Sequence, residues 1–159
     1  MNPFYARMPT TIFEVMSARA RATGAINLGQ GFPDGPGPRD VLDAAARALT
    51  SESNQYPPMA GLPGLRAAVA AHYAAHQRLD LTPDEVIVTS GATEALAASI
   101  LALVQPGDEV VLLQPMYDCY LPMVQQAGGI ARLVTLAAPD WQVSDAILAQ
   151  VFNAKTALI

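Results

Sequence analysis

The second half of the chain alternates short β-branched runs with helical stretches, and this alternation constrains the fold more than any other feature. The runs predict four strands, EVIVT (85–89), EVVLLQ (109–114), ARLVTL (131–136) and TALI (156–159). The intervening stretches predict helices at 92–104, 117–127 and 144–153. Each crossover is long enough to return the chain parallel to the previous strand. We therefore expect a largely parallel α/β sheet covered by helices.

The first half of the sequence predicts three helices joined by loops. Thr11 and Glu14 form a capping-box pattern and Gly24 suits a helix end, which together indicate a helix over 11–23. Apolar spacing predicts two more helices, at 39–50 and 62–78. The segments between them are too rich in glycine and proline for regular structure.

Composition narrows the class of protein. The 159 residues suit one domain, and 52% are hydrophobic but only 14% charged, so apolar surface is expected to be buried against a partner or a further part. A net charge of −5 and scattered arginines argue against nucleic-acid binding. The sequence has no apolar run long enough for a membrane span and no signal peptide, so we expect a cytoplasmic protein.

The stretch VTSGATEAL (88–96) passes from a β-branched run through Gly91 into the first turn of a helix. A helix N-terminus offers unpaired N–H groups and a positive dipole end, and a glycine lets a ligand approach the backbone. This pattern suits a phosphate. An equally weighted alternative is that Ser90 or Thr93 only caps the helix.

A second segment, QPMYDCY (114–120), follows the next predicted strand at its carboxyl end, where open α/β sheets bind their ligands. Tyr117 in this segment could stack on a flat aromatic ligand. The alternative, favoured for any single tyrosine, is packing in the first turn of a helix.

Taken together, these segments resemble the N-terminal part of a fold-type I, pyridoxal-phosphate-dependent aminotransferase of class I/II. The resemblance is greatest to methionine and to kynurenine or glutamine aminotransferases. The segments that carry it follow the family order and cover nearly the whole chain: PTTIFEVMSARARATGAINLGQGFPD (9–34), NQYPPMAGLPGLR (54–66), VTSGATEAL (88–96), GDEVVLLQPMYDCY (107–120) and AGG (127–129).

The resemblance implies cofactor-binding roles for five residues. Around Gly91, the backbone N–H groups of Ala92 and Thr93 would bind the phosphate of pyridoxal 5'-phosphate, and Tyr117 would stack on its pyridine ring. Tyr56, in NQY, would reach across a homodimer interface to the phosphate in the partner subunit.

The same resemblance implies substrate-binding roles for two residues. The backbone of Gly31 would meet the substrate carboxylate, and Phe13 would line the side-chain pocket. Gln114 and Gly35 differ from the residues that the family often has at their positions, which leaves the substrate preference open.

The resemblance further implies a three-layer α/β/α large domain, incomplete here, with an N-terminal helical and loop arm. Residues 1–50 would contribute to the small domain and substrate loop, and 51–159 would begin the cofactor-binding large domain. In the family's sheet order, strands from outside this sequence would separate the 86–89 strand from the others.

No residue of this chain is predicted to be catalytic. Such enzymes need a Schiff-base lysine, and the one lysine, Lys155, resembles a structural basic residue of the family. The expected function is transfer of an amino group from a methionine-, glutamine- or aromatic-type amino acid to a 2-oxo acid, by a longer protein of which this chain alone is inactive. The alternative is a non-catalytic remnant that at most binds phosphate or pairs with a full-length subunit.

Other reactive residues predict no additional chemistry. His72 and His76 have the spacing of a metal-binding pair. However, Tyr73 stands where a His-Glu-x-x-His motif has glutamate, and no third ligand is evident. We therefore expect packing or solvent contact for both histidines, and no metal. Cys119, the single cysteine, is expected to be an inert thiol.

Overall fold

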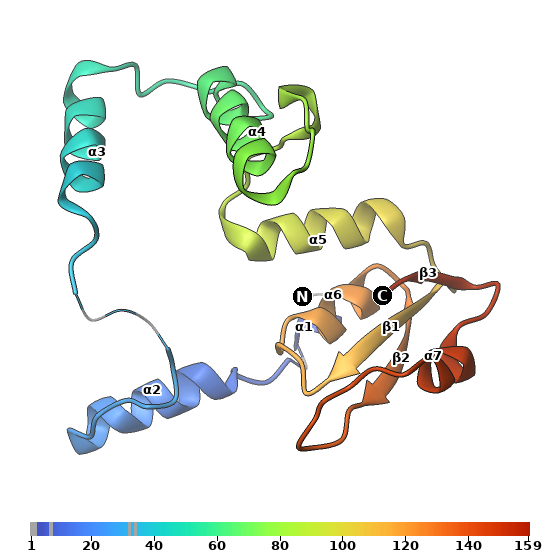
Figure 1. Ribbon diagram of the computed structural model, residues 1–159. Coiled ribbons are helices and arrows are strands. Elements are labelled where there is room, and N and C mark those ends of the chain that lie inside the picture. The colour runs from blue at the N-terminus through green and yellow to red at the C-terminus, as the bar shows by residue number, and fades with distance from the viewer. Residues whose placement is uncertain (1–2, 7, 32, 34) are drawn as a thin grey trace. The chain divides into compact units, whose positions relative to one another are not determined.

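The computed structural model describes residues 3–6, 8–31, 33 and 35–159. By its internal contacts the chain divides into two compact units, Tyr5–Val88 and Thr89–Ile159, and residues 3–4 group with the second (Figure 1). Each unit is described by itself below. The division near residue 50 that the family resemblance implies stays a prediction.

The second unit contains a three-stranded parallel sheet. Its strands are β1 (Glu109–Gln114), β2 (Ile130–Thr135) and β3 (Thr156–Leu158), in the order β2-β1-β3. β1 pairs with β2 in register from Glu109 opposite Ile130 to Gln114 opposite Thr135. The predicted parallel α/β arrangement is thereby confirmed.

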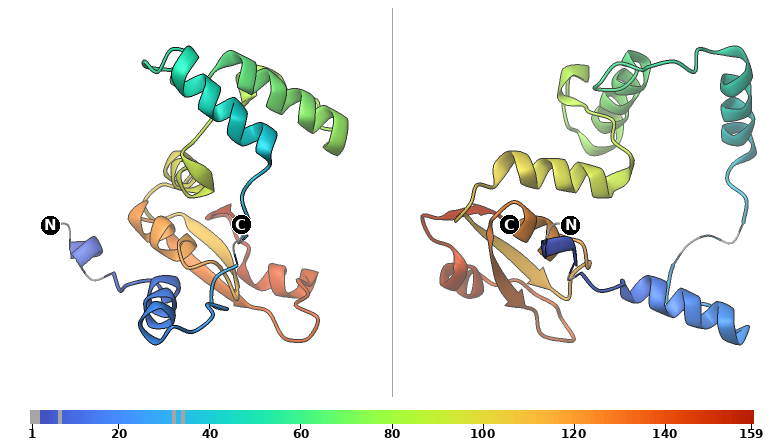
Figure 2. Two further views of the ribbon diagram at one scale, coloured as in Figure 1. Left: turned by 90° about the vertical axis from the view of Figure 1, so that its left-hand side faces the viewer. Right: turned by 180° about the vertical axis from the view of Figure 1, so that it is seen from behind.

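Helices cover both faces of this sheet, which gives three layers. α5 (Gly91–Leu103) and α6 (Tyr120–Gln126) run side by side on one face, and α7 (Asp145–Val151) lies on the other (Figure 2). Beyond its first turn α5 contains no charged residue, as expected of a helix with a buried face. The buried side chains of the core come from α5, β1, α6 and the turn after α5: Ile100, Val104, Val110, Leu112 and Val124.

The prediction of a strand at 85–89 is wrong. Residues 83–85 form a 3-10 turn, η1 (Pro83–Glu85); Val86 after it has an extended backbone, and residues 86–89 belong to no strand. Val88 makes one backbone hydrogen bond to a loop, from its N–H to the Ala60 carbonyl at 3.0 Å. β-branched residues favour an extended backbone, whereas a strand also needs a partner, and the described residues provide no strand beside this segment.

The first unit contains the predicted helices, and α1 (Pro3–Ala6) precedes them in the chain. They are α2 (Ile12–Thr23), α3 (Arg39–Ser51) and α4 (Pro63–Gln77). The Thr11 hydroxyl caps α2 by accepting from the Glu14 N–H at 3.3 Å, and Gly24 ends the helix with φ of 65°. Only half of the capping box forms, because the Glu14 carboxylate bonds Arg21 instead, at 3.0 Å.

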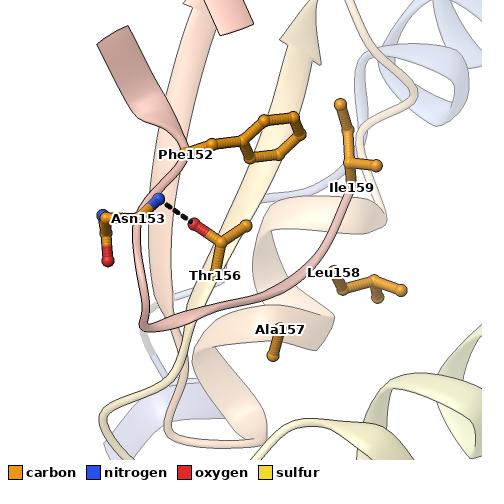
Figure 3. A pocket seen from close by; sticks show the side chains of 6 residues that line it. All are labelled: Phe152, Asn153, Thr156, Ala157, Leu158 and Ile159. Carbon is orange, nitrogen blue, oxygen red and sulfur yellow. Dashed lines mark hydrogen bonds between the residues drawn. The ribbon is translucent and has the colours of Figure 1, made fainter. Parts of the chain in front are cut away.

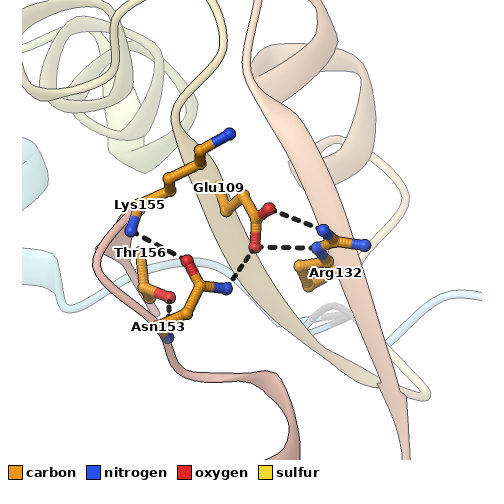
Figure 4. Close-up of polar contacts among 5 residues, drawn as sticks. All are labelled: Glu109, Arg132, Asn153, Lys155 and Thr156. Atoms are coloured by element: carbon orange, nitrogen blue, oxygen red, sulfur yellow. Dashed lines mark hydrogen bonds and ion pairs between the residues drawn. The ribbon is translucent and has the colours of Figure 1, made fainter.

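One buried carboxylate joins the three strands at the amino edge of the sheet (Figure 4). Glu109, the first residue of β1, accepts from Arg132 on β2 at 2.8 and 2.5 Å and from Asn153, just before β3, at 2.8 Å. The hydrogen bonds from Arg132, and then that from Asn153, lower the pKa of Glu109 to about 2. The carboxylate is therefore ionised at neutral pH and stabilises the parallel pairing on both sides of β1.

Within the described residues, every helix is too short or too polar to cross a lipid bilayer.

Candidate active site

The carboxyl ends of β1 and β2 lie at one edge of the sheet, and helices α5 and α6 begin on that same side (Figures 1 and 2). This arrangement follows from parallel strands joined by helical crossovers, in which each helix returns toward the amino edge. Ligands of open α/β sheets bind at the carboxyl edge. VTSGATEAL and QPMYDCY, the two segments singled out in the sequence, contain the starts of these two helices.

The start of α5 has the geometry that an anion site requires. Gly91 has a φ of +81°, and a Cβ added to it would meet no atom within 4 Å. The turn is fixed by two local hydrogen bonds, from the Gly91 N–H to the Thr89 carbonyl at 2.9 Å and from the Thr89 hydroxyl to the Gly91 carbonyl at 3.0 Å. The space beside Gly91 is open to a ligand.

The simple capping alternative fails for Ser90. It is the N-cap residue of α5, but its side chain makes no capping hydrogen bond. Its own N–H donates to the carboxylate of Glu94, from the first turn. Ala92 and Thr93 are exposed in that first turn, in which N–H groups have no intrahelical acceptor. The N–H groups of Ala92 and Thr93 are therefore without an acceptor inside the helix, which is compatible with a bound phosphate at this end of the helix dipole.

Tyr117 lies in the connection from β1 to α6 and is 47% exposed. Its ring meets that of Tyr120 edge-on, with centroids 5.9 Å apart and planes at 67°. The ring is thus held by a neighbour yet keeps much of its surface accessible. The stacking role predicted for this tyrosine stays a prediction.

In the first unit, the loop before Gly31 folds back onto α2 through a polar cluster. The buried Ser17 hydroxyl accepts from Asn27 at 3.1 Å and donates to Gln30 at 3.2 Å. Asn27 in turn accepts from the Gly29 N–H at 3.0 Å. This cluster fixes the path of the chain into Gly31.

The remaining predicted residues of the first unit differ in exposure. Gly31 is exposed, and a Cβ added to it would meet no atom within 4 Å, so its backbone is accessible. Phe13 is half-buried on α2. Tyr56 is 98% exposed. The contacts predicted for these residues, with substrate or with a partner subunit, stay predictions.

Lys155 is at the edge opposite the site. Its carbonyl accepts from the Glu109 N–H at 2.8 Å, at the amino end of β1 (Figure 4). Cys119, near the carboxyl edge, has a thiol pKa raised by burial and by the nearby Asp118, so it stays protonated, as expected of an inert thiol.

A hollow beside β3, of about 450 Å³, is a weaker candidate (Figure 3). Its lining includes the apolar side chains of Phe152, Leu158 and Ile159, and its polar members, Asn153 and Thr156, bond each other at 3.0 Å. Binding sites combine an apolar wall with free polar groups that orient the ligand. The hollow offers no charged side chain for that purpose.

Two residues that shape the site could not be assigned from the sequence motifs alone. The Glu94 carboxylate accepts the hydrogen bond of the Ser90 N–H. The sequence feature that could have indicated this contact is an acidic residue in the first turn of a helix. Ser17 gives no such signal, because its partners are 10 and 13 residues away.

Comparison with known proteins agrees with this fold. Residues 23–156 match the family model for aminotransferase class I and II. The chain is 51% identical over 132 residues to "Probable N-succinyldiaminopimelate aminotransferase DapC" of Mycobacterium tuberculosis, covering 82% of this chain and 33% of the relative. It is 43% identical over 151 residues to methionine aminotransferase of Escherichia coli, covering 91% of this chain and 39% of the relative.

Solved structures give the same result. The crystal structure of YbdL from Escherichia coli, described as having a methionine aminotransferase function, matches with a TM-score of 0.92 and 39% identity, over 98% of this chain and 41% of that one. The chain belongs to the class I and II aminotransferase family and has the fold-type I α/β architecture. It spans about a third to two fifths of the length of the relatives it matches.

Proposed function

We propose that this chain forms the N-terminal part of a pyridoxal-phosphate-dependent aminotransferase and provides its phosphate site. The observation that carries the proposal is the start of α5, where the Ser90 side chain makes no cap and the space beside Gly91 is open. In this proposal Ala92 and Thr93 bind the cofactor phosphate through their N–H groups, and Tyr117 supports its ring.

The residues present fit this cofactor. A phosphate needs N–H donors at a positive helix end, and a pyridine ring needs a flat apolar surface. Tyr117 offers such a surface, since it is 47% exposed and braced edge-on by Tyr120. When bound, pyridoxal phosphate acts as the electron sink that lets an amino group leave one carbon and join another.

The chain's own residues would bind and orient, but not transfer protons. The one lysine, Lys155, lies at the amino edge of the sheet, away from the start of α5. We therefore propose that the 159 residues alone do not catalyse transamination. The lysine and the further substrate ligands would come from the rest of a longer protein.

Three residues of the first unit would complete the site, one of them across a dimer interface. Tyr56, which is 98% exposed, would bind the phosphate of the cofactor in the partner subunit. The exposed backbone of Gly31 would meet the substrate carboxylate, and Phe13 would line the side-chain pocket.

The substrates proposed are a methionine-, glutamine- or aromatic-type amino acid as donor and a 2-oxo acid as acceptor. The methionine aminotransferase similarity supports this choice. A second candidate, an N-succinyldiaminopimelate-type substrate, is favoured by the 51% identity to a relative of that name. The alternative is a non-catalytic remnant. It predicts that the chain binds phosphate and that no longer protein containing this sequence is made.

A comparison of pyridoxal 5'-phosphate with pyridoxal tests the phosphate site. Titration of the purified chain should show the phosphorylated compound binding at least about tenfold more tightly, because each charge-assisted hydrogen bond contributes about 1.5–3 kcal/mol. Equal affinity for both compounds would overturn the assignment of Ala92 and Thr93. Turnover of amino and 2-oxo acids by this chain, with a borohydride-reducible adduct on Lys155, would instead overturn the proposed inactivity.

A further inference from the structure

We propose that His72 and His76 form a two-imidazole binding site for a late divalent transition metal ion on the surface of α4. This site is separate from the phosphate site and does not rest on the proposed function. The sequence alone favoured packing or solvent contact for the two histidines, but the arrangement of the two rings adds information that the sequence lacks.

The rings already lie close together. Residues four apart are neighbours on one face of a helix, and the centroids of these two imidazoles are 4.5 Å apart, with planes at 43°. A metal–nitrogen bond is about 2.0–2.1 Å, which puts an imidazole centroid roughly 3.2 Å from the ion and two imidazoles in adjacent positions roughly 4.5 Å apart. The observed separation matches that spacing.

Both side chains are exposed, so a metal ion can reach them without opening the fold. They lie on a helix of 15 residues, which fixes the separation of their backbones. Tyr73, between them in sequence, is half-buried, and its ring lies edge-on to that of His72 with centroids 6.2 Å apart.

The chemistry of the ligands selects the class of metal. Imidazole nitrogen suits copper, nickel and zinc, with copper bound most tightly, whereas magnesium and calcium require oxygen ligands. The described residues contain no group of three or more histidine, cysteine or acidic side chains that could hold a metal. The ion would therefore keep water in its other positions, as a surface chelate does.

Calorimetric titration of the untagged chain with nickel chloride tests the site. We expect one ion per chain, and an affinity about tenfold or more lower in His72→Gln and in His76→Gln, because the second imidazole binds intramolecularly only when both are present. Magnesium chloride should give no binding. Unchanged nickel affinity in both variants would overturn the proposal.

A matched control keeps two histidines but breaks their spacing. The double variant His76→Gln, Gln77→His places the second imidazole five residues from His72, about 140° around the helix. It should bind nickel as weakly as His76→Gln, with helix content by circular dichroism unchanged. Full affinity in this double variant would show that the pair on one face is not the site. Nickel should also raise the Tm of the wild-type chain but not that of His72→Gln.

Discussion

Arg66, in the first turn of α4, donates from Nε to the main-chain carbonyl of Val86 at 2.8 Å. The same side chain, only 16% exposed, pairs with Asp84 at 3.1 Å. These contacts hold the chain extended just before the turn at Ser90. Residues 86–89, which do not form the predicted strand, are thus held in position by Arg66.

Replacing this arginine should release the segment. Arg66→Met is expected to lower the free energy of unfolding by about 1–3 kcal/mol, because the Val86 carbonyl loses its partner, and to speed hydrogen exchange of the Val88 amide. Urea denaturation and exchange mass spectrometry measure both effects. Arg39→Met removes an exposed pair with Asp43 and should change stability by less than about 1 kcal/mol; equal effects from both variants would contradict this role.

The Glu109 carboxylate should make stability depend on pH. Its pKa falls from 4.5 to about 2 on folding, so the stabilisation is complete above pH 4.5 and is lost as pH falls toward 2. Urea midpoints of wild type and Glu109→Gln should differ most above pH 5 and converge near pH 2. If the difference between the two urea midpoints stayed constant over this pH range, ionisation of Glu109 would not be the cause of the stabilisation.

Removing one donor should weaken the phosphate site. Ala92→Pro deletes an N–H in the first turn of α5, where proline is tolerated. It is expected to weaken pyridoxal 5'-phosphate binding about tenfold and to leave pyridoxal binding unchanged. Ala92→Ser, which keeps the N–H, is the control. Fluorescence titration distinguishes these outcomes, and an equal loss for both compounds would point to misfolding of the turn instead.

The ring of Tyr117 should matter more than its hydroxyl. Tyr117→Ala is expected to weaken cofactor binding by roughly two- to tenfold, in line with about 0.5–1.5 kcal/mol for an aromatic contact, whereas Tyr117→Phe should bind within about twofold of wild type. The same titration measures both. Equal losses in the two variants would assign the effect to the hydroxyl and remove the stacking role.

Loss of the Ser17 hydroxyl should loosen the loop before Gly31. Ser17→Ala removes the hydrogen-bond partner of Asn27 and Gln30. It should lower the free energy of unfolding by about 1–2 kcal/mol and speed hydrogen exchange of the Gly29 amide. Ser51→Ala removes an exposed hydroxyl bonded to the Arg47 carbonyl. This control should change the free energy of unfolding by less than about 0.5 kcal/mol. Unchanged exchange at Gly29 would exclude the polar cluster as the support of this loop.

Local chemistry made much of the fold predictable. Thr11 and Gly24 delimit α2 because a capping hydroxyl and a left-handed glycine act within one turn of the helix. β1 was predicted with its observed bounds, since an apolar run between turns has few other solutions. Residues 86–89, VIVT, form a similar apolar, β-branched run, but sequence composition does not reveal whether a partner strand is present.

The polar contacts that fix the site and sheet were less predictable. Arg132 and Asn153 reach Glu109 across 23 and 44 residues, and no local pattern encodes such distances. At the start of α5 the motif predicted an anion site, but the choice between Ser90 and Glu94 as capping group depends on side-chain rotamers. The sequence therefore indicated a candidate site more readily than the contacts that hold its residues in place.

The position of Lys155 has a practical consequence for spectroscopy. Because it is the one lysine of the chain and is exposed, reductive methylation with carbon-13 formaldehyde would add a single side-chain NMR signal beside that of the terminal amine. That signal would report on the amino edge of the sheet, next to Glu109. Because the label would lie at the amino edge, it would not obstruct ligand binding at the carboxyl edge.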